Sequence, residues 1–455
     1  MTSIWWIRRD VRLEDNAALH AALDAGPVIP VFILDPNLLP LTSVRRQAFL
    51  FDGLRELDSD LQKRNSRLTV RGGKPVHVLH RLVQETNSKT IFAEEDYTPY
   101  ARKRDTQIAN ELSLQLILGQ TVHHPGSVKK ADGKPYTVYT HFSRAWKSLL
   151  ADIKLIPAPK TFPKVDLPRS EDLPESVPSK YFPAGEKEAL RRLNQFADLP
   201  IYRYADDRNR MDLDGTSSLS PYIRFGMIGL RQAVYYAKQA LVNAGSAEAS
   251  RNAEVWLNEL IWREFYIQIL YHFPHVAKTA FNPSLANIPW RNNEGEFQAW
   301  KYGRTGVPIV DAAMRQLKEI GWMHNRARMI VASFLVKDLL INWRWGEAWF
   351  MENLLDGDPA ANNGGWQWTA GTGTDAAPYF RIFNPVLQSA KFDPKGDYIR
   401  KWIPELSAVG TKDIHAPWER GIKIAGYPER PIVNREIVKE RAIQAYNQSK
   451  MRQTS

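Results

Sequence analysis

The sequence contains no cysteine among its 455 residues. Disulfide bonds, thiolate catalysis and cysteine-ligated metal sites are therefore excluded, and an intracellular, cytoplasmic protein fits best. No uncharged apolar run reaches the length of a membrane span, and the N-terminus lacks the apolar segment and cleavage site of a signal peptide. We expect a soluble, monomeric protein with no metal ion.

A phosphate-binding glycine motif is also missing where a dinucleotide fold would need it. Residues 8–15 follow the first apolar run without a Gly-x-Gly-x-x-Gly pattern, which argues against a dehydrogenase. Residues 371–377 approach such a pattern, but no apolar strand precedes them. The dinucleotide interpretation is therefore dismissed.

Strand and helix patterns alternate in the first part of the chain. Short apolar runs at residues 4–7, 28–34, 68–71 and 90–93 predict buried parallel strands, and residues 16–23 predict a helix between the first two. This alternation predicts a doubly wound α/β domain, with a parallel sheet, at residues 1–128.

Seven prolines between residues 157 and 183 mark the next segment. Proline at this density fits neither a helix nor a central strand, so residues 129–195 are expected to form a linker laid over the surface.

Helical periodicity dominates the remainder, and an all-helical domain is expected at residues 196–455. The clearest helical patterns run over residues 189–196, 230–242, 253–270, 310–320, 328–342 and 347–355. Twelve of the 15 tryptophans lie at or after position 256. So many aromatic side chains indicate either a large core or a planar cofactor.

The charge balance favours a polyanionic partner. Lysine and arginine total 61 against 50 for aspartate and glutamate, a net charge of +11. This excess fits nucleic acid, but solubility alone would also explain it.

Two segments carry polar side chains in patterns that suit a ligand. Residues 214–221 offer three consecutive hydroxyl residues and a fourth two positions on, which can bind phosphate or simply cap a helix. Residues 356–368 combine aspartates, asparagines and glycines with two tryptophans. The aspartates alone would fit a turn, whereas the small residues let a backbone approach a flat ligand.

Several motifs together resemble the photolyase and cryptochrome family. They are residues 5–13, 214–220, 256–266, 321–329, 356–368 and 379–385, and they span nearly the whole chain in order. The chain is most similar to class I photolyases that repair cyclobutane pyrimidine dimers. The resemblance implies an enzyme in which photoexcited, reduced FAD passes an electron to a dimer flipped out of UV-damaged DNA.

The resemblance also implies a cofactor site. Tyr204 and the hydroxyl loop match the residues that hold the FAD pyrophosphate, although Ser218 stands where some relatives carry arginine. Arg328 matches the partner of the first carboxylate, and Asn362 matches the residue that faces flavin N5. The implied cofactor-binding residues are Tyr204, Thr216, Ser217, Ser218, Leu219, Ser220, Trp256, Arg263, Arg328, Asp356, Gly357, Asp358 and Asn362.

Substrate and electron-transfer residues are implied in the same way. Glu259, Trp262, Arg263 and Tyr266 share one face of an expected helix, which a packed interior face would also explain. The implied substrate and DNA contacts are Arg208, Glu259, Trp262, Asn325, Arg326, Met329, Trp368 and Gln388. Trp366, Trp343 and Trp290 match the family's electron relay, and with Glu259 and Asn362 they form the implied catalytic set.

Single positions separate the branches of the family. Asn362 stands where plant cryptochromes carry aspartate and insect ones cysteine, and Asn325 stands where six-four photolyases carry a second histidine. Tyr100 and Ala101 replace the Asn-Glu pair of folate-binding relatives, so folate is not expected as an antenna chromophore, and a deazaflavin, a second flavin or no antenna at all are the alternatives. A cryptochrome photoreceptor and a plain basic DNA-binding module remain the alternatives.

Overall fold

The computed structural model describes residues 2–451, which divide into two compact units. The first comprises the residues up to Arg203 together with Ser217–Pro274. The second comprises Tyr204–Thr216 and the residues from His275 onward. The boundaries expected at residues 128 and 195 stay a prediction.

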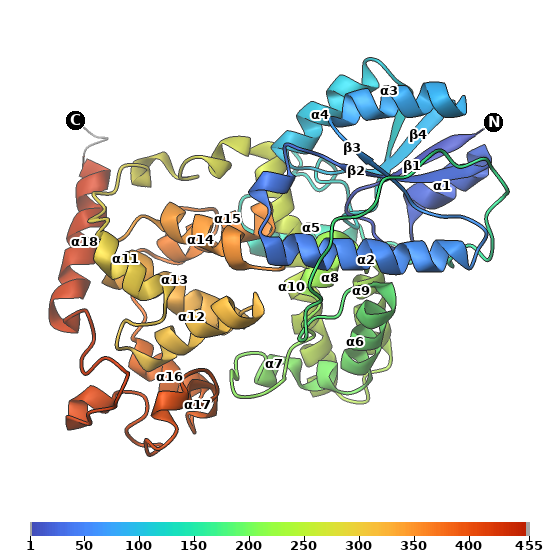
Figure 1. The fold of residues 1–455 in the computed structure, drawn as a ribbon. Helices are drawn as coiled ribbons and strands as arrows, with labels where there is room; N and C mark the ends of the chain where they lie inside the picture. The colour runs from blue at the N-terminus through green and yellow to red at the C-terminus, as the bar shows by residue number, and fades with distance from the viewer. Residues whose placement is uncertain (1, 452–455) are drawn as a thin grey trace. The chain divides into compact units, whose positions relative to one another are not determined.

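A parallel five-stranded sheet of order β3-β2-β1-β4-β5 forms the core of the N-terminal part of the first unit (Figure 1). The strands are β1 (Ser3–Ile7), β2 (Val28–Leu34), β3 (Thr69–Gly72), β4 (Thr90–Glu94) and β5 (Leu114–Ile117). The helices between them are α1 (Ala17–Ala25), α2 (Val44–Gln62), α3 (Pro75–Thr86) and α4 (Pro99–Ala109). The predicted α/β fold and its first four strands are confirmed.

The fifth strand was not predicted. In β5 (Leu114–Ile117) no residue is buried and Gln115 and Leu116 are exposed, so its sequence lacks the apolar run that marks a central strand. Its position at one edge of the sheet explains this composition, because an edge strand has a neighbour on one side only.

The proline-rich segment covers the other edge of the sheet. Residues 150–185 form no helix or strand, yet they are hydrogen-bonded to β3. The amide of Glu171 donates to the carbonyl of Val70 at 2.9 Å, and the amide of Val70 donates to the Ser170 hydroxyl at 2.9 Å. These bonds give the edge strand β3 partners that it would otherwise lack.

The remaining regular elements of the first unit are helical. Its elements are α5 (Tyr139–Ser148), α6 (Glu186–Asp198), the 3₁₀ turn η2 (Pro200–Arg203), α8 (Ser220–Phe225), α9 (Leu230–Val242) and α10 (Ala247–His272). The longest is α10, whose buried residues recur at helical spacing. It carries Trp256, Glu259, Trp262 and Arg263, as the pattern predicted. No helix within residues 2–451 has both the length and the apolar character that crossing a membrane requires.

The second unit is built from helices and short turns (Figure 1). Its α-helices are α7 (Tyr204–Asp207), α11 (Glu294–Lys301), α12 (Pro308–Ile320), α13 (Asn325–Ser333), α14 (Trp343–Asn353), α15 (Pro359–Ala370), α16 (Pro385–Phe392), α17 (Asp397–Trp402) and α18 (Arg435–Met451). The 3₁₀ turns η4 (Pro283–Leu285), η6 (Pro404–Leu406) and η7 (Pro417–Arg420) also belong to it, and η3 (Pro274–Ala277) begins at its boundary. The predicted helical character of the C-terminal domain is confirmed.

The helix expected over residues 328–342 was wrong in its second half. The α-helix α13 ends at Ser333 and continues as a π-helical turn, η5 (Phe334–Asp338). Leu340 then adopts a φ of 53°, which a helix cannot accommodate, and its side chain is buried with Leu285 and Ile288. Long-range packing therefore overrides the local helical pattern.

A glycine allows α14 and α15 to approach closely. A Cβ atom at Gly346 would lie 2.1 Å from Cη2 of Trp366 and 2.6 Å from Cδ2 of Leu335. Both neighbours are buried, so neither can move without disturbing the core.

We predict that Gly346→Ala lowers the free energy of unfolding by about 1 to 3 kcal/mol through overpacking. Gly295→Ala is the matched control, because that helical glycine has only Asn293 Oδ1 nearby, at 3.4 Å. Alanine should leave α11 unchanged or slightly more stable there. Denaturant unfolding of both variants measures the difference, and a Gly346→Ala protein as stable as the wild type would contradict the prediction.

Candidate functional site

Two of the predicted aspartates, Asp356 and Asp358, lie directly before the first residue of α15. Arg328 Nη2 donates to Asp356 Oδ2 at 2.7 Å, and its Nε donates to the carbonyl of Met323 at 2.8 Å. The other carboxylate oxygen of Asp356, Oδ1, is buried and has no hydrogen-bond partner. Because a buried acceptor without a partner is costly, Asp356 Oδ1 is suited to accept a hydrogen bond from a ligand.

Asp358 caps the N-terminus of α15. Its Oδ1 accepts hydrogen bonds from the amides of Ala360 at 3.0 Å and Ala361 at 3.2 Å, and so caps α15. Pro359 follows in the first turn, where a missing amide proton costs nothing. These local signals explain why the helix begins directly after the aspartates.

Two consecutive asparagines of α15 are fixed by one residue of α14. Asn362 Nδ2 donates to the backbone carbonyl of Glu347 at 3.0 Å, and Asn363 Nδ2 donates to Glu347 Oε1 at 2.8 Å. Burial raises the pKa of the Glu347 carboxyl to about 7. With its amide nitrogen engaged, Asn362 retains its side-chain oxygen as a hydrogen-bond acceptor.

The predicted relay tryptophans lie in the second unit. Trp366 is buried on α15, where its ring meets Phe350 edge-on at 5.0 Å and Trp300 at 6.1 Å. Trp343 is buried at the start of α14, and Trp290 is half-buried against Tyr446 at 6.0 Å. Trp300 was missed by sequence reasoning, because no motif surrounds it and only its burial distinguishes it.

The α13 helix places the second group of predicted contacts. Asn325 is its first residue, and Arg326 and Met329 follow within the first two turns. Arg326 donates to Asn209 Oδ1 from Nη2 at 2.6 Å, and its guanidinium lies 4.4 Å from the centre of the Phe392 ring. Sequence reasoning missed Asn209, since no local pattern joins it to a residue 117 positions away.

The remaining predicted residues of the second unit lie on three separate elements. Tyr204 begins α7, and the guanidinium of Arg208 lies 5.4 Å from the centre of its ring. Gln388 is on α16, and Trp368 is half-buried on α15. Thr216 and Gly357 lie in connecting segments.

The hydroxyl loop continues into the first unit and is conformationally strained. Ser218 has a φ of 49°, in the left-handed region that costs a residue other than glycine about 1 to 2 kcal/mol. The N-cap residue of α8 is Leu219, and no side-chain hydrogen bond caps the start of this helix. Capping of α8 therefore does not account for the hydroxyl cluster. Strain of this kind is typical of loops held in place for binding.

Helix α10 presents Trp262 and Glu259 one turn apart. The Trp262 ring stacks on Tyr139 with 3.7 Å between ring centroids and 5° between the planes. Two residues on, Glu264 is buried and accepts a hydrogen bond from Trp146 Nε1 at 2.6 Å. Burial raises its pKa to about 7. Neither Tyr139 nor Glu264 was predicted from the sequence.

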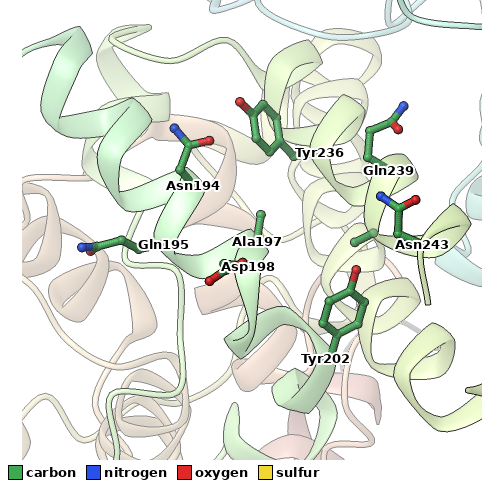
Figure 2. Close-up of a pocket in the computed structure, with 9 residues that line it drawn as sticks. Asn194, Gln195, Ala197, Asp198, Tyr202, Tyr236, Gln239 and Asn243 are labelled. Carbon is green, nitrogen blue, oxygen red and sulfur yellow. The ribbon is translucent and has the colours of Figure 1, made fainter. Parts of the chain in front are cut away.

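A cleft of about 530 Å³ in the first unit lies between α6 and α9 (Figure 2). Amide and tyrosine side chains line it, among them Asn194, Tyr202, Tyr236 and Asn243. None of the predicted site residues lines this cleft. The chemistry indicated by the sequence is therefore elsewhere.

Family models match both parts of the chain. One described as DNA photolyase matches residues 3–164, and one described as FAD binding domain of DNA photolyase matches residues 256–448. The chain is 42% identical to a deoxyribodipyrimidine photo-lyase of Synechococcus sp., over 98% of this chain and 96% of that protein.

Solved structures share the fold. A bacterial class III photolyase from Agrobacterium tumefaciens has a TM-score of 0.92 at 38% identity, covering 99% of this chain and 98% of the other. An archaeal photolyase from Sulfolobus tokodaii, described with two FAD molecules, has a TM-score of 0.85 at 34% identity, covering 98% and 100%. A cryptochrome from Synechocystis sp. has a TM-score of 0.86 at 29% identity, covering 98% of both chains.

The buried His324 gives the second unit a pH-dependent stability. Burial, together with a smaller contribution from the charges of Arg326 and Arg328, lowers the pKa of His324 from 6.5 to about 4. Between these values the unfolded chain binds a proton that the folded chain does not. Acidification from pH 6.5 towards pH 4 therefore removes up to about 3 kcal/mol of stability.

We predict that His324→Asn flattens this pH dependence. Asparagine keeps an acceptor for the amide of Arg326, which His324 Nδ1 now caps at 3.1 Å, but it carries no titrating group. Urea unfolding of both proteins between about pH 4.5 and about pH 7 measures the two slopes. Equal slopes would assign the effect to other groups.

Proposed function

The chain belongs to the photolyase family, and from this premise we propose that it is a light-dependent DNA repair enzyme that splits cyclobutane pyrimidine dimers. The observation that carries the proposal is its full-length similarity, at 42% identity, to a deoxyribodipyrimidine photo-lyase. The class of photolyase is open, because a class III structure is among those most similar. The monomeric state and cytoplasmic location stay predictions.

The geometry around α15 supports FAD as the cofactor. The unpartnered Asp356 Oδ1 is an acceptor for a ring N–H, and Asn362 offers a carbonyl oxygen nearby in the sequence. Arg328 fixes the orientation of the Asp356 carboxylate. FAD would supply the electron that cleaves the dimer, which no side chain can supply at neutral pH.

Further residues of this chain would hold the phosphates and ribose. Tyr204 and the hydroxyls of the loop from Thr216 to Ser220 offer donors to the pyrophosphate. Arg263, Trp256, Leu219, Gly357 and Asp358 complete the proposed cofactor set.

DNA binding would use both charge and aromatic contact. Lysine and arginine neutralise phosphates irrespective of sequence, which suits the net charge of +11. Trp262 and Trp368 are the proposed stacking contacts of the flipped dimer, and Glu259 would bind the pyrimidine edge. A dimer is already poorly paired, so extruding it costs less than extruding an intact base.

Two positions, Asn362 and Asn325, decide which branch of the family we assign this chain to. Asn362 and Asn325 favour dimer repair over photoreception and over six-four repair, respectively. The likeness to a cryptochrome keeps photoreception as the second candidate. Loss of dimers under light separates the two, because a photoreceptor would bind FAD without turning over the lesion.

We propose that any second chromophore in this protein is not folate. Tyr100 stands where folate-binding relatives carry asparagine, and its hydroxyl donates to Asp35 Oδ2 at 2.5 Å. The Sulfolobus tokodaii relative is described with two FAD molecules. The absorbance spectrum of the native protein, compared with that of FAD alone, identifies any additional chromophore.

The experiment that tests the function combines cofactor identity with turnover. The purified protein should release FAD on denaturation and, when reduced and illuminated with blue light, should convert dimer-containing DNA to intact pyrimidines. Release of another chromophore, or illumination without loss of dimers, would overturn the proposal.

We predict that Arg326→Ala weakens binding to dimer-containing DNA by about tenfold or more, since charged hydrogen bonds contribute about 1.5 to 3 kcal/mol. Arg420→Ala removes the same charge from a side chain that is 77% exposed, and should weaken binding to damaged and intact DNA equally. Titrations at several salt concentrations should show steep salt dependence for all proteins. Equal losses for both DNAs in Arg326→Ala would count against a lesion contact.

We predict that Trp366→Phe slows photoreduction of oxidised FAD by more than about tenfold, because phenylalanine is much harder to oxidise than indole. Dimer repair by the chemically reduced protein should be nearly unchanged, since the repair electron does not pass through Trp366. Phenylalanine preserves most of the packing. The two rates are measured under blue light. Wild-type photoreduction would refute the relay role, and loss of both activities would assign Trp366 to cofactor or lesion binding.

A further inference from the structure

Tyr139 occupies one face of the Trp262 indole. Its ring lies parallel to the indole, with centroids 3.7 Å apart and planes 5° apart. At that separation no base fits between the two rings. A flipped base that stacks on Trp262 must therefore use the opposite face.

The tyrosine is itself fixed in place. Its hydroxyl donates to the carbonyl of Asn258 at 2.8 Å, one turn before Trp262 on α10. Its ring also meets Phe265 edge-on at 5.9 Å. The stack on Trp262 and the hydrogen bond to Asn258 together hold Tyr139 against two successive turns of α10.

The helix that carries Tyr139 is anchored at its other end as well. Trp146 on α5 donates its indole N–H to the buried carboxylate of Glu264 on α10. The same carboxylate accepts hydrogen bonds from the amides of Val122 and His123. Because α5 is held to α10 at both ends, the Tyr139 ring has little freedom to leave the stack.

From this geometry we propose that Tyr139 is a positioning residue that fixes the Trp262 indole for stacking on the pyrimidine dimer. The inference rests on the proposed function and deepens it. Tyr139 touches no substrate. It sets the angle of the indole and closes one of its faces, so that Trp262 is ordered before the lesion arrives and loses less entropy on binding.

The test uses variants that separate the stack from the hydrogen bond. Tyr139→Leu removes the stack, and Tyr139→Phe keeps it while removing the bond to Asn258. The measurement is the ratio of affinities for dimer-containing and intact DNA, determined on the FAD-loaded protein. We expect Tyr139→Leu to lower this ratio about two- to tenfold, within the range of aromatic pair energies, and Tyr139→Phe to stay within about twofold.

Phe142→Leu is the matched control. Phe142 lies on the same helix and packs against Phe265 with a centroid distance of 5.3 Å, so its truncation loosens α5 without removing the stack. It should reduce stability while leaving the affinity ratio unchanged. Should Phe142→Leu lower the ratio as much as Tyr139→Leu does, the effect would be structural and the inference would be overturned.

Trp262→Leu and the double variant complete the design. If Tyr139 acts through Trp262, the double variant should lose no more of the ratio than Trp262→Leu alone. Additive losses would overturn the inference. If Trp262→Leu lowers the ratio and Tyr139→Leu leaves it at the wild-type value, the inference about Tyr139 is overturned, while the proposed lesion contact of Trp262 stands. An unchanged ratio in Trp262→Leu would instead refute the proposed lesion contact, and the inference with it.

Discussion

The contact between Glu347 and the paired asparagines of α15 fixes the helix that carries two of the candidate residues, Asn362 and Trp366. The backbone carbonyl of Glu347 accepts a hydrogen bond from Asn362, and its carboxylate accepts one from Asn363. Asn363 also donates to the carbonyl of Val276 at 3.0 Å. Because burial raises the pKa of this carboxyl, the bond from Asn363 must offset part of the desolvation cost. The position of Asn362, and of Trp366 one turn later, depends on that bond.

Elements with a strong local pattern could be predicted from the sequence, and elements set by distant contacts could not. Apolar runs predict the central strands, and helical spacing of apolar residues predicts α10. By contrast, β5 is polar because it is an edge strand, and residues 334–342 leave the α-helix because Leu340 joins the core. The Arg328 and Asp356 pair followed from family resemblance and is present at 2.7 Å. Tyr139, Asn209 and Glu347 had no such signal, because their partners are defined by the tertiary fold.

Several polar features of the candidate residues, and of His324 next to the candidate Asn325, cost stability in the isolated chain. Asp356 Oδ1 and His324 Nε2 are buried without hydrogen-bond partners, and Ser218 is held in a left-handed conformation. Groups of this kind are expected where a ligand supplies the missing partner. A ligand that binds only the folded state then stabilises it by mass action, which links cofactor loading to the stability of the whole chain. The strained and unpaired groups thus have a reason to persist despite their cost.

The tryptophans differ in burial, and the difference bears on the roles proposed for them. Trp366 and Trp343 are 2% and 4% exposed, whereas Trp290 is only half-buried, so the proposed relay runs from the interior towards solvent. Trp262 and Trp368 are also half-buried, and a side chain that stacks on a substrate needs such an open surface. For Trp262 the stacked Tyr139 leaves a single face for that role. The exposure of each tryptophan is thus compatible with the role proposed for it: burial with electron transfer at Trp366 and Trp343, and an open face with stacking at Trp262 and Trp368.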